Sequence, residues 1–196
     1  MSRQVVLIAG SPQLESRSSR VLQSLNERLV AAGIRTKTYQ LGDFDPADLV
    51  FARSTAPAVQ QYLADVQSAS AVLFSTPVYK ATYSGGLKLL LDVIPPDALR
   101  GRTVLAVATA RIGRHFAGVQ RALDELYLFF DVGLAIPSVL LLDEQARIEP
   151  ARGIVYDANA GAAIDKAATA LLHALASPGI DTRGSGVPAL DARAGK

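Results

Sequence analysis

The sequence predicts an α/β protein in which a doubly wound parallel sheet lies between two layers of helices. Short, continuous apolar runs rich in β-branched residues recur along the chain, as expected of strands that are buried on both faces of a parallel sheet. Each run is followed by a segment whose apolar residues recur at helical spacing. Because strand and helix patterns alternate in this way, a parallel sheet is the simplest architecture.

The predicted elements occupy most of the chain from residue 5 to residue 176. The predicted strands are residues 5–9, 34–41, 71–74, 103–109 and 132–142. The predicted helices, each with apolar side chains on one face, are residues 17–31, 57–66, 84–94, 115–130 and 158–176. Segments without such a pattern are predicted to be loops, among them residues 42–46, 76–83, 110–113 and 147–157.

The composition is that of a globular domain and argues against several classes of function. With 49% hydrophobic and 19% charged residues, the 196-residue chain can form one substantial core. We expect one domain over residues 1–176 and a flexible tail, rich in Gly, Pro and Ser, over residues 177–196. A net charge of +2 from scattered basic residues does not favour nucleic acid binding. No apolar run approaches the ~18 residues of a membrane span.

Cysteine is absent, and histidine occurs only at His115 and His173. Disulfides and thiolate metal sites are therefore excluded, and no metal site is predicted. The first apolar run is also too short for the hydrophobic region of a secretory signal. We accordingly expect a cytoplasmic location.

Hydroxyl and guanidinium groups gather directly after the first predicted strand. Gly10 ends this strand, and Ser11, Ser16, Arg17 and Ser18 follow before the first helix is established. The unpaired N–H groups and the dipole of a helix N-terminus attract anions, and these side chains add further donors. The pattern predicts a phosphate site. The alternatives are that Ser16 or Ser18 only caps the helix and that Arg17 forms a surface ion pair.

The motifs that are absent narrow the kind of phosphate ligand. Neither G-x-G-x-x-G nor G-x-x-x-x-G-K-[ST] follows the strand, which disfavours NAD or ATP as the main ligand and suits a single terminal phosphate such as that of FMN. After the third predicted strand, Pro77, Tyr79, Tyr83 and Gly85-Gly86 would allow a flat ring to approach the backbone or to stack on a tyrosine. The alternative is that these tyrosines only pack.

The two motifs together carry a resemblance to a known family. Gly10-Ser11-Pro12, Ser16-Arg17-Ser18-Ser19, residues 76–85 and residues 87–92 resemble the NADPH-dependent FMN reductases, which have a flavodoxin-like fold. The resemblance covers about residues 5–142 and is strong for the reductase components of two-component alkanesulfonate and methanesulfonate monooxygenases. It implies a five-stranded, flavodoxin-like parallel sheet in a three-layer α/β/α arrangement.

The resemblance also implies a flavin site shared by three strand ends. The residues that match the family's phosphate-binding positions are Ser11, Ser16, Arg17 and Ser18. The residues implied to lie around the isoalloxazine ring are Pro77, Val78, Tyr79 and Lys80 on one side and Thr109 on the other. Lys80 either stabilises negative charge on reduced flavin or is a solvated loop lysine.

The activity implied by the resemblance is reduction of FMN by NADPH or NADH. Transfer of a hydride between two cofactors needs no protein acid or base, so no catalytic residue is predicted. The resemblance further implies that reduced FMN passes to a partner monooxygenase in organosulfur metabolism. It also implies a homodimer or homotetramer built through the helices predicted at residues 84–94 and 115–130.

The sequence departs from the family pattern at two places and leaves other functions open. The third strand exit reads Thr109-Ala110-Arg111 where the family usually has Thr-Gly-Gly, and Arg121 stands where the sulfonate reductases have an aromatic residue or histidine. The roles of Arg111, His115 and Arg121 stay open. One alternative function is an FMN-retaining quinone or azo reductase. Another is a flavodoxin-like electron carrier, which the charge of +2 disfavours because such carriers usually have acidic docking surfaces.

Overall fold

A five-stranded parallel sheet forms the centre of the protein, which confirms the predicted fold class. The computed structural model describes residues 3–13, 15–149, 151 and 153–176, so the predicted tail at residues 177–196 lies outside the described residues. The strand order is β2-β1-β3-β5-β6. The bounds of these strands are Gln4–Ala9 for β1, Arg35–Gln40 for β2, Ala71–Tyr79 for β3, Thr103–Ala110 for β5 and Leu134–Leu142 for β6.

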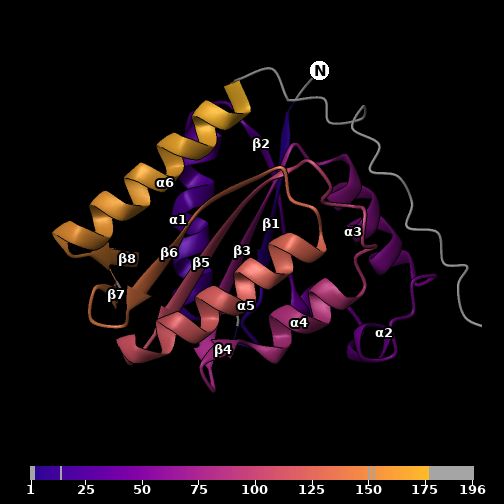
Figure 1. The fold of residues 1–196 in the computed structure, drawn as a ribbon, viewed down its shortest axis with the longest axis horizontal. Coiled ribbons are helices and arrows are strands. Elements are labelled where there is room, and N and C mark those ends of the chain that lie inside the picture. Colours follow the sequence, from indigo (N-terminus) through magenta and orange to yellow (C-terminus); the bar gives the residue numbers. More distant parts are fainter. Residues whose placement is uncertain (1–2, 14, 150, 152, 177–196) are drawn as a thin grey trace, which may run out of the picture.

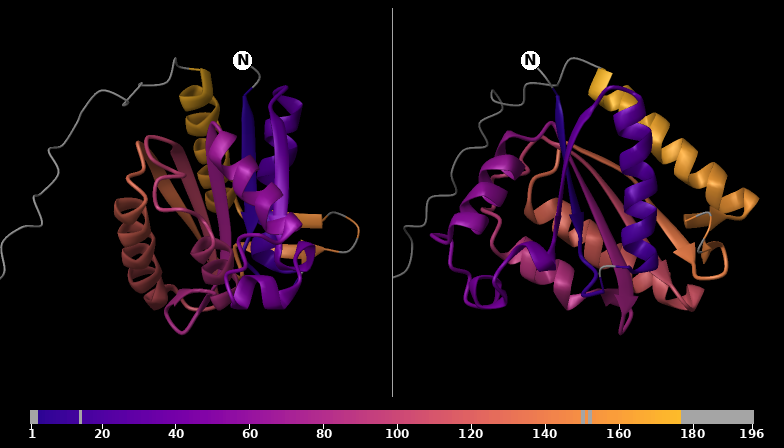
Figure 2. Two further views of the ribbon diagram at one scale, coloured as in Figure 1. Left: turned by 90° about the vertical axis from the view of Figure 1, so that its right-hand side faces the viewer. Right: turned by 180° about the vertical axis from the view of Figure 1, so that it is seen from behind.

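Helices cover both faces of the sheet, as Figures 1 and 2 show. One face packs on α1 (Arg17–Ala31) and α6 (Ala158–Ala176), and the other on α3 (Pro57–Ser68), α4 (Gly85–Asp92) and α5 (Phe116–Phe129). The strands supply both cores by alternation: Leu7, Leu73 and Leu105 belong to the first core, whereas Ile8, Phe74 and Ala106 belong to the second. This burial on both faces explains the continuous apolar runs in the sequence.

Helix α1 ends at Ala31, the predicted bound, and Gly33 forms the turn that follows it. Gly33, with a φ of +77°, follows the cap residue Ala32. Its N–H donates to Val30 O at 2.9 Å, and the N–H of Ile34 donates to Leu29 O at 3.0 Å. This pair of hydrogen bonds is the Schellman motif, which requires a left-handed residue at the position of Gly33.

The pairing of β5 with β6 is locally irregular at Pro137. Leu105 pairs with Ile136 and Val107 pairs with Val139, so Pro137 and Ser138 together lie opposite one residue of β5. Proline is tolerated there because β6 is at the edge of the sheet and the pairing is locally shifted.

Two segments that we predicted as loops form hairpins, so those predictions were wrong. β3 continues through residues 76–79 and pairs with the short antiparallel strand β4 (Thr82–Tyr83), and within residues 147–157 β7 (Ala146–Glu149) pairs with β8 (Gly153–Tyr156). The first hairpin lacks the usual sequence signal because its turn residues, Lys80 and Ala81, have positive φ without being Gly or Asn. The strands of the second hairpin have four residues each, too few for a clear alternation.

A short helix, α2 (Pro46–Val50), also lies in a region for which no helix was predicted. Its five residues are too few to show helical periodicity. The signal was nevertheless present, because the side chain of Asp45 accepts from the N–H of Ala47 and Pro46 occupies the first turn. In the part of the chain that the structure describes, no helix is long and apolar enough to cross a membrane.

Several tyrosines are buried in ways that should make the fold sensitive to alkaline pH. Burial raises the pKa of Tyr127 to about 12, and burial also raises the pKa values of Tyr39 and Tyr62. The unfolded value is near 10, so the contribution of the neutral Tyr127 phenol to stability is complete below pH ~10 and is lost as the pH rises from about 10 to about 12.

We therefore expect phenolate absorbance from these tyrosines to appear only together with loss of the circular dichroism of the fold. Tyr127→Phe keeps the ring and removes this ionisation, so the variant should unfold at a higher pH than the parent protein. Urea-unfolded protein provides the reference titration. If all six tyrosines titrate near pH 10 while the fold persists, the expectation is wrong.

Candidate functional site

The carboxyl ends of β1, β3 and β5 meet at one edge of the sheet, the lower edge in Figure 1. Most buried polar side chains of the described residues lie at these strand ends or at the starts of the helices that follow. They are Ser11, Ser18, Ser75, Thr76, Ser84 and Thr109. The carboxyl edge of the sheet, where ligands bind in folds of this kind, is therefore underlain by buried hydroxyl groups.

One serine of the loop after β1 caps α1, and capping does not account for the other hydroxyl groups nearby. The Ser16 Oγ accepts from the N–H of Ser19 at 3.1 Å and is the N-cap. The same oxygen lies 3.1 Å from Ser18 Oγ and 2.8 Å from Ser19 Oγ. Ser11 Oγ accepts from the N–H of Gln13 at 3.1 Å. A cap needs one hydroxyl, so this cluster has more donors than capping requires.

Arg17 lies at this loop and is held by an ion pair, the alternative that we left open. Its Nη1 is 2.8 Å from Oδ1 of Asp143, the residue that follows β6. Its Nε is buried and has no hydrogen-bond partner among the described residues. The guanidinium thus uses one nitrogen for the ion pair and keeps further donors, because arginine has five N–H groups in a planar fork.

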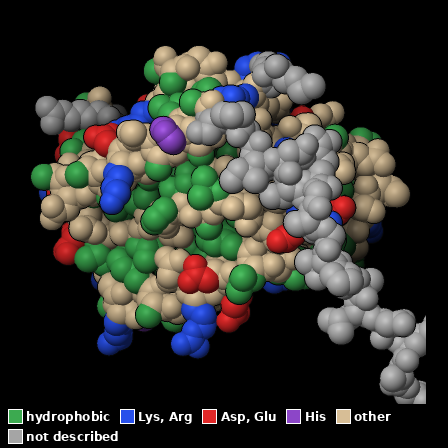
Figure 3. All heavy atoms as spheres, turned by 45° about the horizontal axis from the view of Figure 1, so that its top comes forward, with side chains coloured by type: hydrophobic (Ala, Val, Ile, Leu, Met, Phe, Trp, Pro, Cys, Tyr) green, Lys and Arg blue, Asp and Glu red, His purple; other side chains and the backbone are tan. Residues whose placement is uncertain are grey.

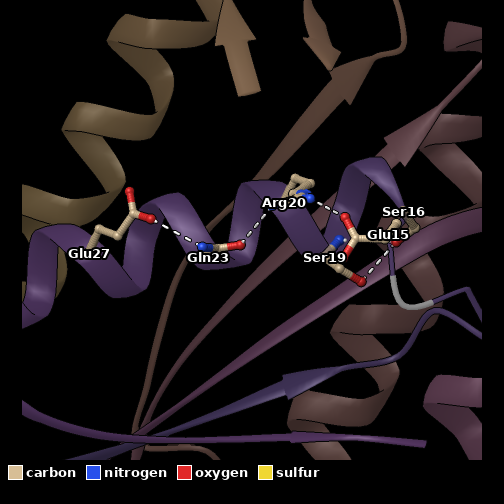
Figure 4. A network of polar contacts seen from close by, with 6 residues as sticks. All are labelled: Glu15, Ser16, Ser19, Arg20, Gln23 and Glu27. Atoms are coloured by element: carbon tan, nitrogen blue, oxygen red, sulfur yellow. Dashed lines mark hydrogen bonds and ion pairs between the residues drawn. The ribbon is translucent and has the colours of Figure 1, made fainter. Parts of the chain in front are cut away.

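The neighbouring Arg20 contacts other side chains of the same segment, as Figure 4 shows. Its side chain pairs with Glu15 and donates to Gln23 Oε1 at 3.3 Å, and Gln23 in turn donates to Glu27 at 3.2 Å. These contacts extend along α1 from Glu15, which precedes Ser16, to Glu27. Within the described part of the chain, each arginine thus has one carboxylate partner and a buried Nε without a partner, and Arg17 stays the candidate for an anion because it is the first residue of α1.

A buried hydrogen-bond network fixes the loop after β1 against the start of α4. The N–H of Gly10 donates to Ser75 O at 2.8 Å, and the Ser84 hydroxyl donates to Gly10 O. Ser84 Oγ also accepts from the N–H of Leu87 at 3.0 Å, and the N–H of Ser84 donates to Thr76 Oγ1 at 2.9 Å. Sequence reasoning did not identify Ser84 as part of the site, although a serine directly before a helical pattern is a capping signal.

The residues expected around a flat ring lie along β3, β4 and β5. Pro77 is the register partner of Thr109, and Val78 and Tyr79 belong to the β3–β4 hairpin. Tyr79 is 45% exposed, and Lys80 is exposed at the turn. The two strand segments thus place Pro77 and Thr109 side by side, with Val78, Tyr79 and Lys80 extending outward from them.

Helix α5 supports this hairpin through a glycine that the sequence analysis did not single out. A Cβ on Gly118 would lie 2.4 Å from Ala81 O, so only glycine permits this approach. The residues whose roles we left open lie nearby in the chain: Arg111 is exposed, His115 is partly buried in the turn before α5, and Arg121 is exposed on α5. No group of metal-ligating side chains exists within the described residues.

The residues present fit a phosphate-bearing flavin. The loop after β1 combines a helix N-terminus, neutral hydroxyls and one guanidinium, which are the groups that bind a phosphate. Four buried polar atoms have no hydrogen-bond partner among the described residues, namely Arg17 Nε, Arg20 Nε, Asn26 Oδ1 and Ser75 Oγ, and of these Arg17 and Ser75 belong to the elements that meet at the candidate site. Such atoms are rare in native structures and call for an explanation, which a bound ligand could provide for those that face it.

The fold and this site define a flavodoxin-like α/β protein with a loop rich in hydroxyl groups after its first strand. The chain belongs to the NADPH-dependent FMN reductase family, since the model of that family matches residues 3–146. This finding confirms the resemblance noted in the sequence.

Relatives with known names support the same family. The chain is 41% identical over 119 residues to an FMN reductase (NADPH) of Escherichia coli (strain K12), covering 61% of this chain and 62% of that protein. It is 43% identical over 119 residues to an FMN reductase (NADPH) of Pseudomonas putida, covering 61% and 60%. The matched region thus spans less than two thirds of these two relatives. An NADH-dependent FMN reductase, SfnF, of Pseudomonas putida is 33% identical over 160 residues, covering 76% and 84%.

Solved structures agree on the fold. A crystal structure of an NADH:FMN oxidoreductase (EMOB) in its apo form superimposes with a TM-score of 0.81. It covers 90% of this chain and 91% of that chain at 22% sequence identity. At this identity the likeness concerns the fold alone.

Proposed function

We propose that this protein is an NAD(P)H-dependent FMN reductase. The observation that carries the proposal is the loop after β1 in a chain of this family, where Ser11 lies in the loop, Ser16 caps α1, and Arg17 and Ser18 are in the first turn of that helix. These groups would hold the FMN phosphate by hydrogen bonds and one positive charge.

The ring side of the site would be formed by Pro77, Val78, Tyr79, Lys80 and Thr109. When bound, FMN accepts the hydride that NADPH or NADH donates, and the cofactors themselves carry this chemistry. The protein's task is to position the flavin and to leave one ring face open to the nicotinamide. The exposed position of Lys80 fits either of its two proposed roles, and Tyr79, which is exposed as well, is available for stacking.

We further propose that reduced FMN is supplied to a flavin-dependent monooxygenase, in keeping with the sequence resemblance to sulfonate-system reductases. The protein would act in the cytoplasm as one domain over residues 1–176. Self-association through α4 and α5 is part of the proposal. It is supported by exposed hydrophobic side chains at the end of α5 and the start of β6, namely Leu128 (82% exposed), Phe129 (62%) and Leu134 (48%). Figure 3 shows hydrophobic side chains gathered near the middle of the visible face.

Oxidation of the nicotinamide nucleotide tests the proposed activity. Purified protein, dialysed to remove flavin, is supplied with NADPH or NADH and, in separate reactions, with FMN or a quinone, and the loss of nicotinamide absorbance is followed. We expect oxidation that depends on added FMN and rises with its concentration.

Two results would contradict the proposal. Quinone reduction by protein that retains flavin through dialysis would indicate a flavin-retaining quinone reductase instead. Absence of both FMN binding and nucleotide oxidation would remove every enzymatic function considered for this site.

A further inference from the structure

The partner of Arg17 bears on how tightly the proposed site holds a phosphate. Arg17 Nη1 and Asp143 Oδ1 are 2.8 Å apart, and their side chains are 30% and 37% exposed. The pair joins the N-terminus of α1 to the end of β6, two segments that are far apart in the sequence. A carboxylate therefore lies at direct contact distance from the guanidinium that we assign to the phosphate.

The position of Asp143 is fixed by its own backbone. Its N–H donates to Ala110 O at 2.9 Å, which ties it to the end of β5. The residues on either side form a tight turn, in which the N–H of Leu142 donates to Gln145 Oε1 at 2.8 Å and the N–H of Gln145 donates to Leu142 O at 3.0 Å. The carboxylate is thus a built part of the carboxyl edge of the sheet.

Arg17 can hold Asp143 and a phosphate at the same time. The ion pair uses Nη1, whereas Nε is buried without a partner among the described residues. The planar guanidinium can direct other N–H groups at an anion while Asp143 keeps the plane oriented. The cost of this arrangement is electrostatic, because the carboxylate cancels most of the charge of Arg17 and repels a phosphate dianion.

We propose that Asp143 is a positioning residue that orients Arg17 and, through its negative charge, weakens the binding of the flavin phosphate. This inference rests on the proposed FMN reductase function and adds a control of affinity to it. A reductase that releases reduced FMN to another protein needs a phosphate site from which the flavin can dissociate. Weaker phosphate binding raises the dissociation rate, since affinity changes within one site act mainly on that rate.

The variant Asp143→Asn tests the inference, because asparagine keeps an oxygen that can accept from Arg17 and loses only the charge. Binding of FMN and of riboflavin, which lacks the phosphate, is measured by quenching of flavin fluorescence at low and at moderate salt. We expect Asp143→Asn to bind FMN roughly five- to tenfold more tightly at low salt, with a smaller gain at higher salt. Its affinity for riboflavin should equal that of the parent protein.

Glu144→Gln is the matched control, since it removes the same charge from the adjacent, exposed residue. Its FMN affinity should stay close to that of the parent protein. If Asp143→Asn binds FMN no more tightly, or if FMN and riboflavin gain equally, the inference is wrong while the proposed function stands. If the parent protein binds neither flavin, the proposed function fails and the inference fails with it.

A second measurement needs no variant. With the Arg17 charge largely cancelled, FMN binding by the parent protein should weaken only slightly as salt is raised. A steep loss of FMN affinity with salt in the parent protein would show an uncompensated positive site and would overturn the role of Asp143.

Discussion

Gly10→Ala should destabilise the protein by about 3 kcal/mol and displace the loop after β1. A Cβ at this position would lie 2.4 Å from Leu87 Cβ, 2.8 Å from Leu87 Cα and 2.9 Å from Ser75 O. Two of these atoms are backbone, so the clash cannot be relieved by a change of rotamer. β1 and α4 must separate, which strains the contacts that Gly10 makes with Ser75 O and the Ser84 hydroxyl.

Chemical denaturation and thermal unfolding measure the effect, and for a chain of this size a loss of about 3 kcal/mol lowers Tm by roughly 6–12 °C. Gly85→Ala is the matched control, because a Cβ there meets nothing within 4 Å and Gly85 is not at positive φ. That variant should be as stable as the parent protein or slightly more so. Equal stability of the two variants would show that α4 does not pack this closely against Gly10.

The sequence pattern was sufficient for the elements that are long and locally determined. Helices α1 and α6 have the predicted bounds, since their apolar faces extend over several turns and α1 begins and ends with local capping signals. The sheet class followed from strands buried on both faces. The β3–β4 and β7–β8 hairpins were not predicted. The turn of the β3–β4 hairpin is formed by non-glycine residues with positive φ, and the strands of the β7–β8 hairpin are very short.

For the candidate site, the sequence predicts which residues follow each strand, but it does not predict which distant residues they contact. Local spacing placed Ser11, Ser16, Arg17 and Ser18 after a strand, and in the structure Ser11 lies in the loop after β1 while the other three form the cap and the first turn of α1. Their long-range partners leave no trace in a local pattern. The pairing of Arg17 with Asp143 and the contact of Gly10 with Leu87 depend on how strands distant in sequence come to share one edge. Those contacts determine the charge and the rigidity of the site.

Arg17→Ala should raise the dissociation constant of FMN at least about tenfold, which corresponds to about 1.4 kcal/mol and is the size expected for one charged hydrogen bond. Riboflavin affinity should change little, because the residue is assigned to the phosphate. The protein should remain folded, since the partly exposed ion pair with Asp143 contributes at most about 1 kcal/mol. Flavin fluorescence titration gives the affinity, and denaturation gives the stability.

Arg20→Ala is the control for this prediction, because Arg20 is a charge of the same kind on the same helix that is engaged by Glu15 and Gln23 (Figure 4). Equal losses of FMN affinity in the two variants would mean that general positive potential acts on the flavin and that Arg17 makes no specific contact. Arg17→Ala also leaves the carboxylate of Asp143 unpaired beside the phosphate, so part of its effect should be repulsion. The double variant Arg17→Ala, Asp143→Asn should therefore recover a portion of the lost affinity, and the portion recovered separates the repulsion by Asp143 from the attraction by Arg17.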